Sequence, residues 1–163
     1  MSNLQHEVVE ALEDTQKDKF LTFALGEQSY GIDIKYVTEI IGIQSITEVP
    51  ELPNYICGII NLRGKIIPVM DVRLRFKKQF RTYNDRTCII VVDISNISVG
   101  LIVDLVSEVL TIPEADIVPP PEINQGTHRF IRGIGKVNQE VKLILDCDKL
   151  LNEDELEQLE DFE

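Results

Sequence analysis

The sequence predicts an all-β protein, built as a barrel or a sandwich, because short apolar runs rich in Val and Ile alternate with turn residues. Four pairs of such runs lie between residues 20 and 146, and no long amphipathic helix separates them. The chain of 163 residues is long enough for one domain with a sizeable apolar core, so folding requires neither a disulfide nor a metal. A composition of 44% hydrophobic and 27% charged residues is typical of a globular chain.

Four hairpins are predicted, each from two apolar runs that flank a short turn. They pair residues 20–25 with 30–34, 57–62 with 65–71, 87–94 with 97–112, and 130–137 with 141–146. Gly26 is free to adopt the positive φ of a tight turn in the first hairpin, and Arg63-Gly64 forms the turn of the second. Gly100, inside an apolar run, suggests a bulge or a bend.

Three segments depart from the hairpin pattern. Residues 35–41 place apolar side chains at positions i, i+3 and i+4, which predicts a short helix. Residues 152–159 begin with an asparagine cap and have acids in the first turn, which predicts a short C-terminal helix. Residues 113–128 contain four prolines and are expected to form an ordered excursion between strands.

Charge is distributed unevenly along the chain. The net charge of −12 argues against a general nucleic-acid binder, because neutralising phosphates requires clustered Lys and Arg. Residues 1–16 carry −4 and residues 147–163 carry −7, so both ends are expected to be solvated and to maintain solubility. Residues 63–86 carry +6 and residues 87–128 carry −6. These two stretches either pair within the fold or face different partners.

The residues that ordinarily support catalysis or metal binding lack their usual partners. Cys57, Cys88 and Cys147 form no CxxC pair, so we expect free thiols that act as small core residues in a reducing compartment. His6 and His128 have no second histidine at metal-binding spacing. The sequence therefore predicts no metal site and no cofactor.

Sequence motifs also favour an interaction module over an enzyme. Gly133-Ile134-Gly135-Lys136 lacks the spacing and the final Ser or Thr of a phosphate-binding loop. Asp93, Asp104 and Asp146 end apolar runs, where a turn or capping role is favoured over catalysis. The polar, acidic start is not a signal peptide, and no apolar run reaches the length of a membrane helix. We expect a cytoplasmic protein.

Several separated blocks resemble the CheW family of chemotaxis coupling proteins. They are LGEQSYGIDI (25–34) followed by VTEI (37–40), NLRGKIIPVMDVRLRF (61–76), GLIVDLVSEVL (100–110) and IRGIG (131–135). The resemblance implies two packed five-stranded SH3-like β-barrels with a hydrophobic junction, to which the sequence adds short helices, one of them at the C-terminus. It covers the coupling domain at residues 19–151, and the acidic tail at 1–18 and the acidic helix or tail at 152–163 lie outside it.

The resemblance also implies a function without catalysis. Members of the family bridge the cytoplasmic tips of methyl-accepting chemoreceptors to the regulatory domain of the histidine kinase CheA, in arrays apposed to the membrane. The implied partners are therefore these receptors, CheA and other copies of the coupling protein in array rings. Neither a nucleic acid nor insertion into the membrane is implied.

Carried over onto this sequence, the resemblance implies several site residues. The receptor-binding positions are Val37, Glu39, Ile40, Ile41, Arg63 and Val109. Ile123 is implied to contact the kinase domain or another coupling protein, whereas Gly58 and Gly64 are expected to shape turns. Arg63, at a hairpin tip, is expected to pair with Glu39. Packing into the barrel is an alternative role for Val37 and Ile41, and a plain core position is an alternative for Val109.

Two other functions stay open from the sequence. The first is a small-ligand-binding β-barrel that uses the apolar junction between the lobes as its pocket. The second is a scaffold of the same kind that serves a receptor system outside chemotaxis, because specificity depends on few surface residues.

Overall fold

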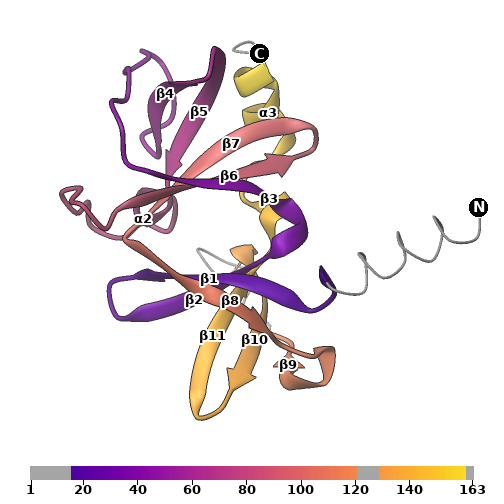
Figure 1. Ribbon diagram of the computed structural model, residues 1–163. Coiled ribbons are helices and arrows are strands. Elements are labelled where there is room, and N and C mark those ends of the chain that lie inside the picture. Colours follow the sequence, from indigo (N-terminus) through magenta and orange to yellow (C-terminus); the bar gives the residue numbers. More distant parts are fainter. Residues whose placement is uncertain (1–15, 121–128, 161–163) are drawn as a thin grey trace, which may run out of the picture.

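The computed structural model describes residues 16–120 and 129–160, which form two stacked β-sheet lobes (Figure 1). One sheet has the spatial order β8-β1-β2-β11-β10-β9, and the other has the order β3-β6-β7-β5-β4. The strands are β1 Lys19–Leu25, β2 Gln28–Asp33, β3 Val37–Gly42, β4 Ile56–Leu62, β5 Lys65–Asp71, β6 Cys88–Ile94, β7 Ile97–Val103, β8 Leu105–Thr111, β9 Ile117–Val118, β10 Ile131–Val137 and β11 Glu140–Leu145. The predicted all-β class is confirmed.

Short helices connect these strands and end the described chain. They are the 3-10 helices η1 Ile34–Tyr36, η2 Glu114–Asp116 and η4 Cys147–Lys149, and the α-helices α2 Val72–Arg75 and α3 Glu153–Glu160. The predicted C-terminal helix is therefore confirmed. Asn152 Oδ1 accepts the Glu155 N–H at 2.8 Å, and a Glu155 carboxylate oxygen accepts the Asn152 N–H at 2.9 Å. This reciprocal pair is a capping box.

The five-stranded lobe is inserted in the sequence of the six-stranded lobe. The chain leaves the six-stranded sheet after β2, builds β3 to β7, and returns at β8. The sixth strand, β9, has two residues and lies within the predicted proline-rich excursion. It pairs with β10. A bridge between Thr47 and Ile59 joins the segment after β3 to β4, so the two edges of the five-stranded sheet meet as in a barrel.

The four predicted hairpins are present, with one change. Residues 97–112 form two strands in place of one, because the chain crosses between sheets at Asp104. Strand β7 pairs with β6, whereas β8 pairs with β1 of the other lobe. The apolar pattern runs through this crossing without a break, because β7 is largely buried and β8 half-buries Val106 and Leu110, so the pattern alone does not reveal the crossing.

The helix predicted over residues 35–41 is wrong. The chain makes one 3-10 turn, η1, and then strand β3, which pairs antiparallel with β6. Along β3, half-buried and exposed side chains alternate, which is the period of a strand. The β-branched residues Val37, Thr38, Ile40 and Ile41 favour this extended pairing over a helix.

Gly100 does not mark a bulge. Its pairings with Val91 on β6 and Val69 on β5 are regular. A Cβ atom at this position would lie 2.7 Å from Ile89 Cγ2 and 2.8 Å from Val69 Cγ1. Glycine is required here because the core has no room for a side chain.

The largest apolar cluster spans both lobes. Aromatic rings form a row through it, with centroids 5.6 Å apart for Phe23 and Tyr30, 5.6 Å for Tyr30 and Phe76, and 5.4 Å for Phe76 and Phe130. Helix α3 contributes buried Leu159 to the same cluster. The expectation that the acidic end only maintains solubility is therefore too narrow, since α3 closes part of the core.

Candidate interaction site

The turn between β4 and β5 presents Arg63 to solvent. Leu62 and Lys65 pair across a two-residue loop in which Arg63 has φ 53° and Gly64 has φ 85°. Positive φ at both central residues is the geometry that suits the twist of a hairpin. The Gly64 N–H donates to Asn61 Oδ1 at 2.8 Å, which fixes the loop, and the Arg63 side chain is 70% exposed.

Glu39 lies on β3 and forms an ion pair with Arg63, as the sequence predicts. Strands β3 and β4 are the two edge strands of the five-stranded sheet, so the ion pair crosses the closure of this lobe. The hydrogen bond and the charge of Glu39 raise the pKa of the Arg63 guanidinium above its ordinary value. The pair presents both charges on the surface in a defined geometry.

The apolar residues of β3 divide into two groups. Val37 packs against the cluster at the lobe junction, and Ile41 packs against the core inside the five-stranded lobe. Both side chains are half-buried, which agrees with the alternative that they pack into the fold. Ile40 points the other way and is 43% exposed, so β3 presents an apolar side chain to solvent next to Glu39.

Val109 is on β8, the edge strand of the six-stranded sheet, and is 47% exposed. The alternative that Val109 is a plain core residue is wrong. The structure thus brings Arg63 and Glu39 into contact and leaves Val109 on the other lobe. Ile123 lies outside the described residues.

The two glycines expected to shape turns have different roles. Gly64 belongs to the β4–β5 turn, as predicted. Gly58 is inside β4, where the register shifts between Ile56 and Gly58, and has φ 146°. A Cβ atom on Gly58 would lie 2.1 Å from the carbonyl oxygen of Thr47. Gly58 therefore permits the close backbone approach at the Thr47–Ile59 bridge and is not a turn residue.

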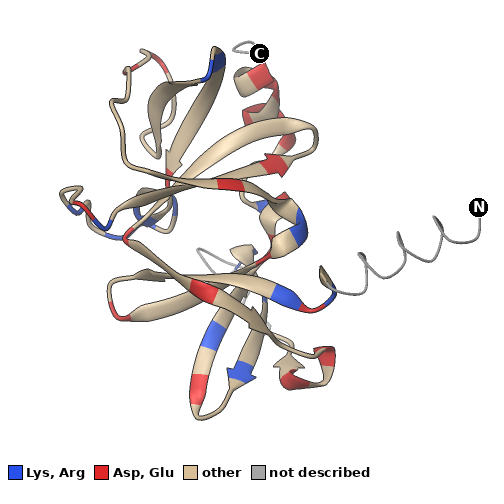
Figure 2. Ribbon diagram, in the orientation of Figure 1, with Lys and Arg blue, Asp and Glu red and all other residues tan. Residues whose placement is uncertain are grey.

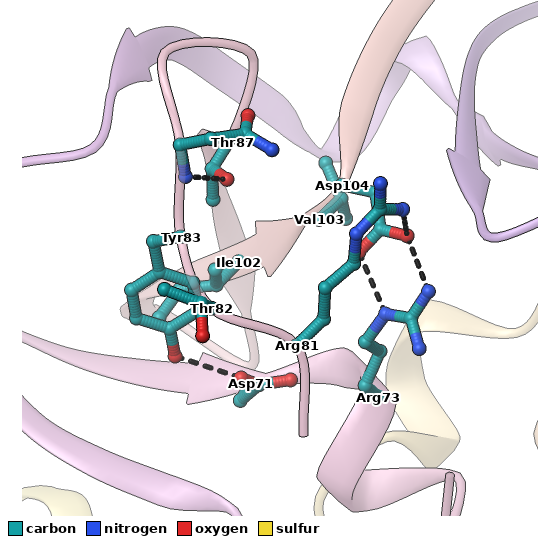
Figure 3. A pocket seen from close by; sticks show the side chains of 10 residues that line it. Asp71, Arg73, Arg81, Thr82, Tyr83, Thr87, Ile102, Val103 and Asp104 are labelled. Atoms are coloured by element: carbon teal, nitrogen blue, oxygen red, sulfur yellow. Dashed lines mark hydrogen bonds and ion pairs between the residues drawn. The ribbon is translucent and has the colours of Figure 1, made fainter. Parts of the chain in front are cut away.

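Sequence reasoning missed a polar cluster around Asp104 (Figure 3). Its carboxylate accepts hydrogen bonds from Arg73 Nε at 2.7 Å, Arg73 Nη2 at 2.5 Å, Arg81 Nη1 at 3.0 Å and the Gly26 N–H at 2.6 Å. Burial opposes ionisation, but these hydrogen bonds prevail and lower the pKa of Asp104 to about 2. The signal available in the sequence was the opposite charge of residues 63–86 and residues 87–128. Arg73 and Arg81 lie in the first segment and Asp104 in the second, so here the two segments pair within the fold.

A second polar contact lies beside this cluster. The Tyr83 hydroxyl donates to the buried Asp71 carboxylate at 2.7 Å and lies 3.5 Å from Cys57 Sγ. Burial raises the pKa of the Cys57 thiol, so the neutral form is favoured. The pocket between Asp71 and Asp104 has a volume of about 10 Å³, the space of one water molecule.

Comparison with known proteins assigns the family. A family model described as a CheW-like domain matches residues 19–155. The chemotaxis protein CheW of Klebsiella aerogenes is 37% identical over 145 residues, which cover 88% of this chain and 87% of that relative. The chemotaxis protein CheW of Helicobacter pylori is 34% identical over 136 residues, with coverages of 83% and 82%.

A solved structure agrees with these matches. The scaffolding protein TtCheW from Thermoanaerobacter tengcongensis is 41% identical, with a TM-score of 0.79 over 85% of this chain and 94% of that one. Within residues 16–120 and 129–160, no helix has both the length and the apolar character to cross a membrane. On the family match, the identities and the shared fold, this chain belongs to the CheW family.

Proposed function

We propose that this chain is a cytoplasmic adaptor that couples the tips of methyl-accepting chemoreceptors to the histidine kinase CheA and catalyses no reaction itself. Its family supports the proposal, because the relatives above are chemotaxis proteins and the related structure is that of a scaffolding protein. In this proposal residues 19–151 are the coupling module, and the chain joins receptor arrays through its partners.

The observation that carries the proposal is the exposed ion pair between Arg63 and Glu39. A hydrogen-bonded turn fixes Arg63, and β3 fixes Glu39 beside exposed Ile40. A helical receptor tip offers both an apolar stripe and charged side chains at helical spacing, and this surface provides a partner for each. Ordered charges of this kind give an interface its orientation and specificity more than its affinity.

Two further positions complete the proposed contacts. Val109, exposed on the six-stranded lobe, is proposed as a second apolar receptor contact. Ile123 is proposed to contact the kinase domain or another copy of the coupling protein in a ring. Val37 and Ile41 are proposed to act chiefly by holding β3 in place, because both pack against apolar clusters.

Binding to two isolated partners tests the proposal. Calorimetry of the full chain against a receptor cytoplasmic hairpin, and separately against a CheA regulatory domain, is expected to show binding to both. Binding to the kinase domain alone would transfer the proposal to another receptor system. Binding to neither would overturn it and favour a small-ligand barrel.

A further inference from the structure

The loop between α2 and β6, residues 77–86, presents an aromatic side chain among cations. Phe80 is 57% exposed, the largest exposed fraction among the exposed large hydrophobic side chains of the described chain. Lys77, Arg81 and Arg86 are exposed in the same loop, which contains a single acidic residue. In Figure 2 the blue of Lys and Arg gathers in this loop and in neighbouring α2. An exposed aromatic side chain with arginines in the same loop matches the residue types that are enriched at protein interfaces.

Hydrogen bonds on both sides of Phe80 hold the loop in place. Arg73 Nη1 donates to the carbonyl oxygen of Gln79 at 3.3 Å. Arg81 Nη1 donates to Asp104 at 3.0 Å, and Asp104 also accepts from Arg73. The residues that flank Phe80 are thus attached to the partly buried carboxylate of Asp104, Arg81 directly and Gln79 through Arg73.

The second half of the loop is also anchored. The Phe80 ring meets the Tyr83 ring edge to face, with 5.3 Å between centroids. The Tyr83 hydroxyl donates to buried Asp71, as Figure 3 shows. The Asn84 N–H donates to Thr87 Oγ1 at 2.9 Å. A side chain that is already fixed loses little conformational entropy on binding, which favours affinity.

Electrostatics decides which class of partner fits this loop. The whole chain carries −12, of which −7 lies in residues 147–163, so a long nucleic acid or an anionic bilayer would also meet this acidic segment and be repelled by it. Screening limits exposed charges to a range of about 8 Å at physiological salt. A short acidic peptide segment on the loop therefore experiences the local cations and little of the distant acidic surface.

We propose that residues 77–86 form a docking surface for an acidic polypeptide segment that places an apolar side chain against Phe80. The exposed cations Lys77 and Arg86 attract and orient the segment, and the Phe80 ring supplies the desolvated contact at the centre. The proposal uses none of the residues proposed above for the receptor and kinase contacts, which lie on β3, in the β4–β5 turn, on β8 and at Ile123.

The test is binding of a fluorescein-labelled peptide of glutamates around two central leucines to the full chain, followed by anisotropy. We expect saturable binding that weakens as salt rises. Reversing two loop charges, in Lys77→Glu with Arg86→Glu, is expected to weaken binding at least about tenfold, and Phe80→Ser about tenfold. The same peptide with glutamine in place of glutamate is expected not to bind.

Matched variants separate the loop from general effects. Lys17→Glu with Lys136→Glu changes the net charge equally at exposed sites elsewhere, and Val141→Ser removes an exposed apolar side chain, 55% exposed, from β11. Both are expected to bind the peptide as the unaltered chain does. Thermal melts by circular dichroism establish that every variant is folded.

Three results would overturn the proposal. The first is no binding of the acidic peptide to the folded chain. The second is an equal loss of binding in the loop variants and the matched variants. The third is tighter binding of a homopolymeric RNA, or of vesicles containing phosphatidylserine, than of the peptide, which would assign the loop to another class of partner.

Discussion

Arg75 and Glu155 form a two-point ion pair at the lobe junction, with Nη1 to Oε2 at 3.1 Å and Nη2 to Oε1 at 2.9 Å. Arg75 Nε also donates to the carbonyl oxygen of Leu150 at 2.9 Å, and the guanidinium lies 4.2 Å from the centroid of the Tyr55 ring. Burial, together with the positive charge of Arg129, lowers the pKa of Arg75 to about 10, so Arg75 stays charged at neutral pH. One buried cation therefore attaches α3 to α2 and to the core.

Removing the carboxylate of this pair is expected to destabilise the fold strongly. In Glu155→Ala the guanidinium of Arg75, whose side chain is only 7% exposed, loses its counter-charge, and the Asn152 N–H loses its cap. Breaking a buried ion pair from one side costs about 3 kcal/mol or more in the free energy of unfolding. Urea denaturation measures this change.

The control for this variant is on the same helix. Glu157 is exposed, so Glu157→Ala removes an equal charge from α3 and is expected to change the free energy of unfolding by less than about 0.5 kcal/mol. Equal stability of the two variants would show that the Arg75–Glu155 pair contributes nothing beyond a solvated charge.

Asp104 is expected to make stability depend on pH in the acid range. Its pKa, about 2 in the folded chain, is below the ordinary value of 3.8. A carboxyl group whose pKa is lower in the folded than in the unfolded state contributes its full stabilisation of the fold at a pH above its unfolded-state pKa. This stabilisation is lost as the pH falls through the folded-state pKa. The contribution of Asp104, about 2 kcal/mol, should therefore be present above about pH 4 and be largely lost near pH 2.

Comparison with Asp104→Asn isolates this group from the other acids. At neutral pH the variant should be less stable by about 2 kcal/mol, and the two unfolding curves should converge as the pH approaches 2. Asp85→Asn, in the exposed loop, serves as the control and should run parallel to the unaltered chain. A constant difference between the Asp104→Asn and unaltered curves across this range would contradict the assigned cause.

Gly58 and Gly64 are expected to respond differently to the same substitution. Gly58→Ala places a Cβ atom against the backbone oxygen of Thr47 at a φ that L-residues rarely adopt, so we expect a loss of about 3 kcal/mol or more. Gly64→Ala meets no atom within 4 Å and should cost about 1 kcal/mol, from its positive φ alone. Both values come from denaturant unfolding.

A second change identifies the cause at Gly58. Ile46→Ala removes Cγ2, the side-chain atom 3.0 Å from a Cβ at position 58, but leaves the Thr47 carbonyl oxygen in place, so it should not rescue Gly58→Ala. Rescue would show that the crowding involves side chains and not the approach of two backbones.

Much of the fold follows from local sequence patterns. Alternating apolar runs and two-residue turns predict the hairpins because each signal lies within a few residues, as at Arg63-Gly64. The apolar spacing of residues 35–41 also satisfies a helical period and so predicts a helix, and only the pairing with β6 excludes that interpretation. The sheet crossing at Asp104 escaped prediction because it depends on which strands pair far apart in sequence.

Some contacts of the candidate site follow from the sequence and others do not, for a similar reason. The Arg63–Glu39 contact was predicted because the family resemblance places both residues in one surface motif and their charges are complementary. No short motif marks Arg75 as a buried residue. Its charge is buried because Glu155, 80 positions later in the sequence, pairs with it. Contacts between distant segments require the three-dimensional pairing that no short motif contains.

Arg63 is expected to matter for partner binding and little for folding. Its side chain is 70% exposed, and exposed ion pairs contribute little to stability, so Arg63→Ala should leave the melting temperature unchanged. If the receptor contacts this surface, the same variant should weaken binding of a receptor hairpin about tenfold, measured by calorimetry. Exchanging the charges, in Glu39→Arg with Arg63→Glu, retains an ion pair but reverses the surface pattern and should bind as poorly as Arg63→Ala. Loss of binding in parallel with unfolding would make Arg63 a structural residue and remove the interface from β3 and the β4–β5 turn.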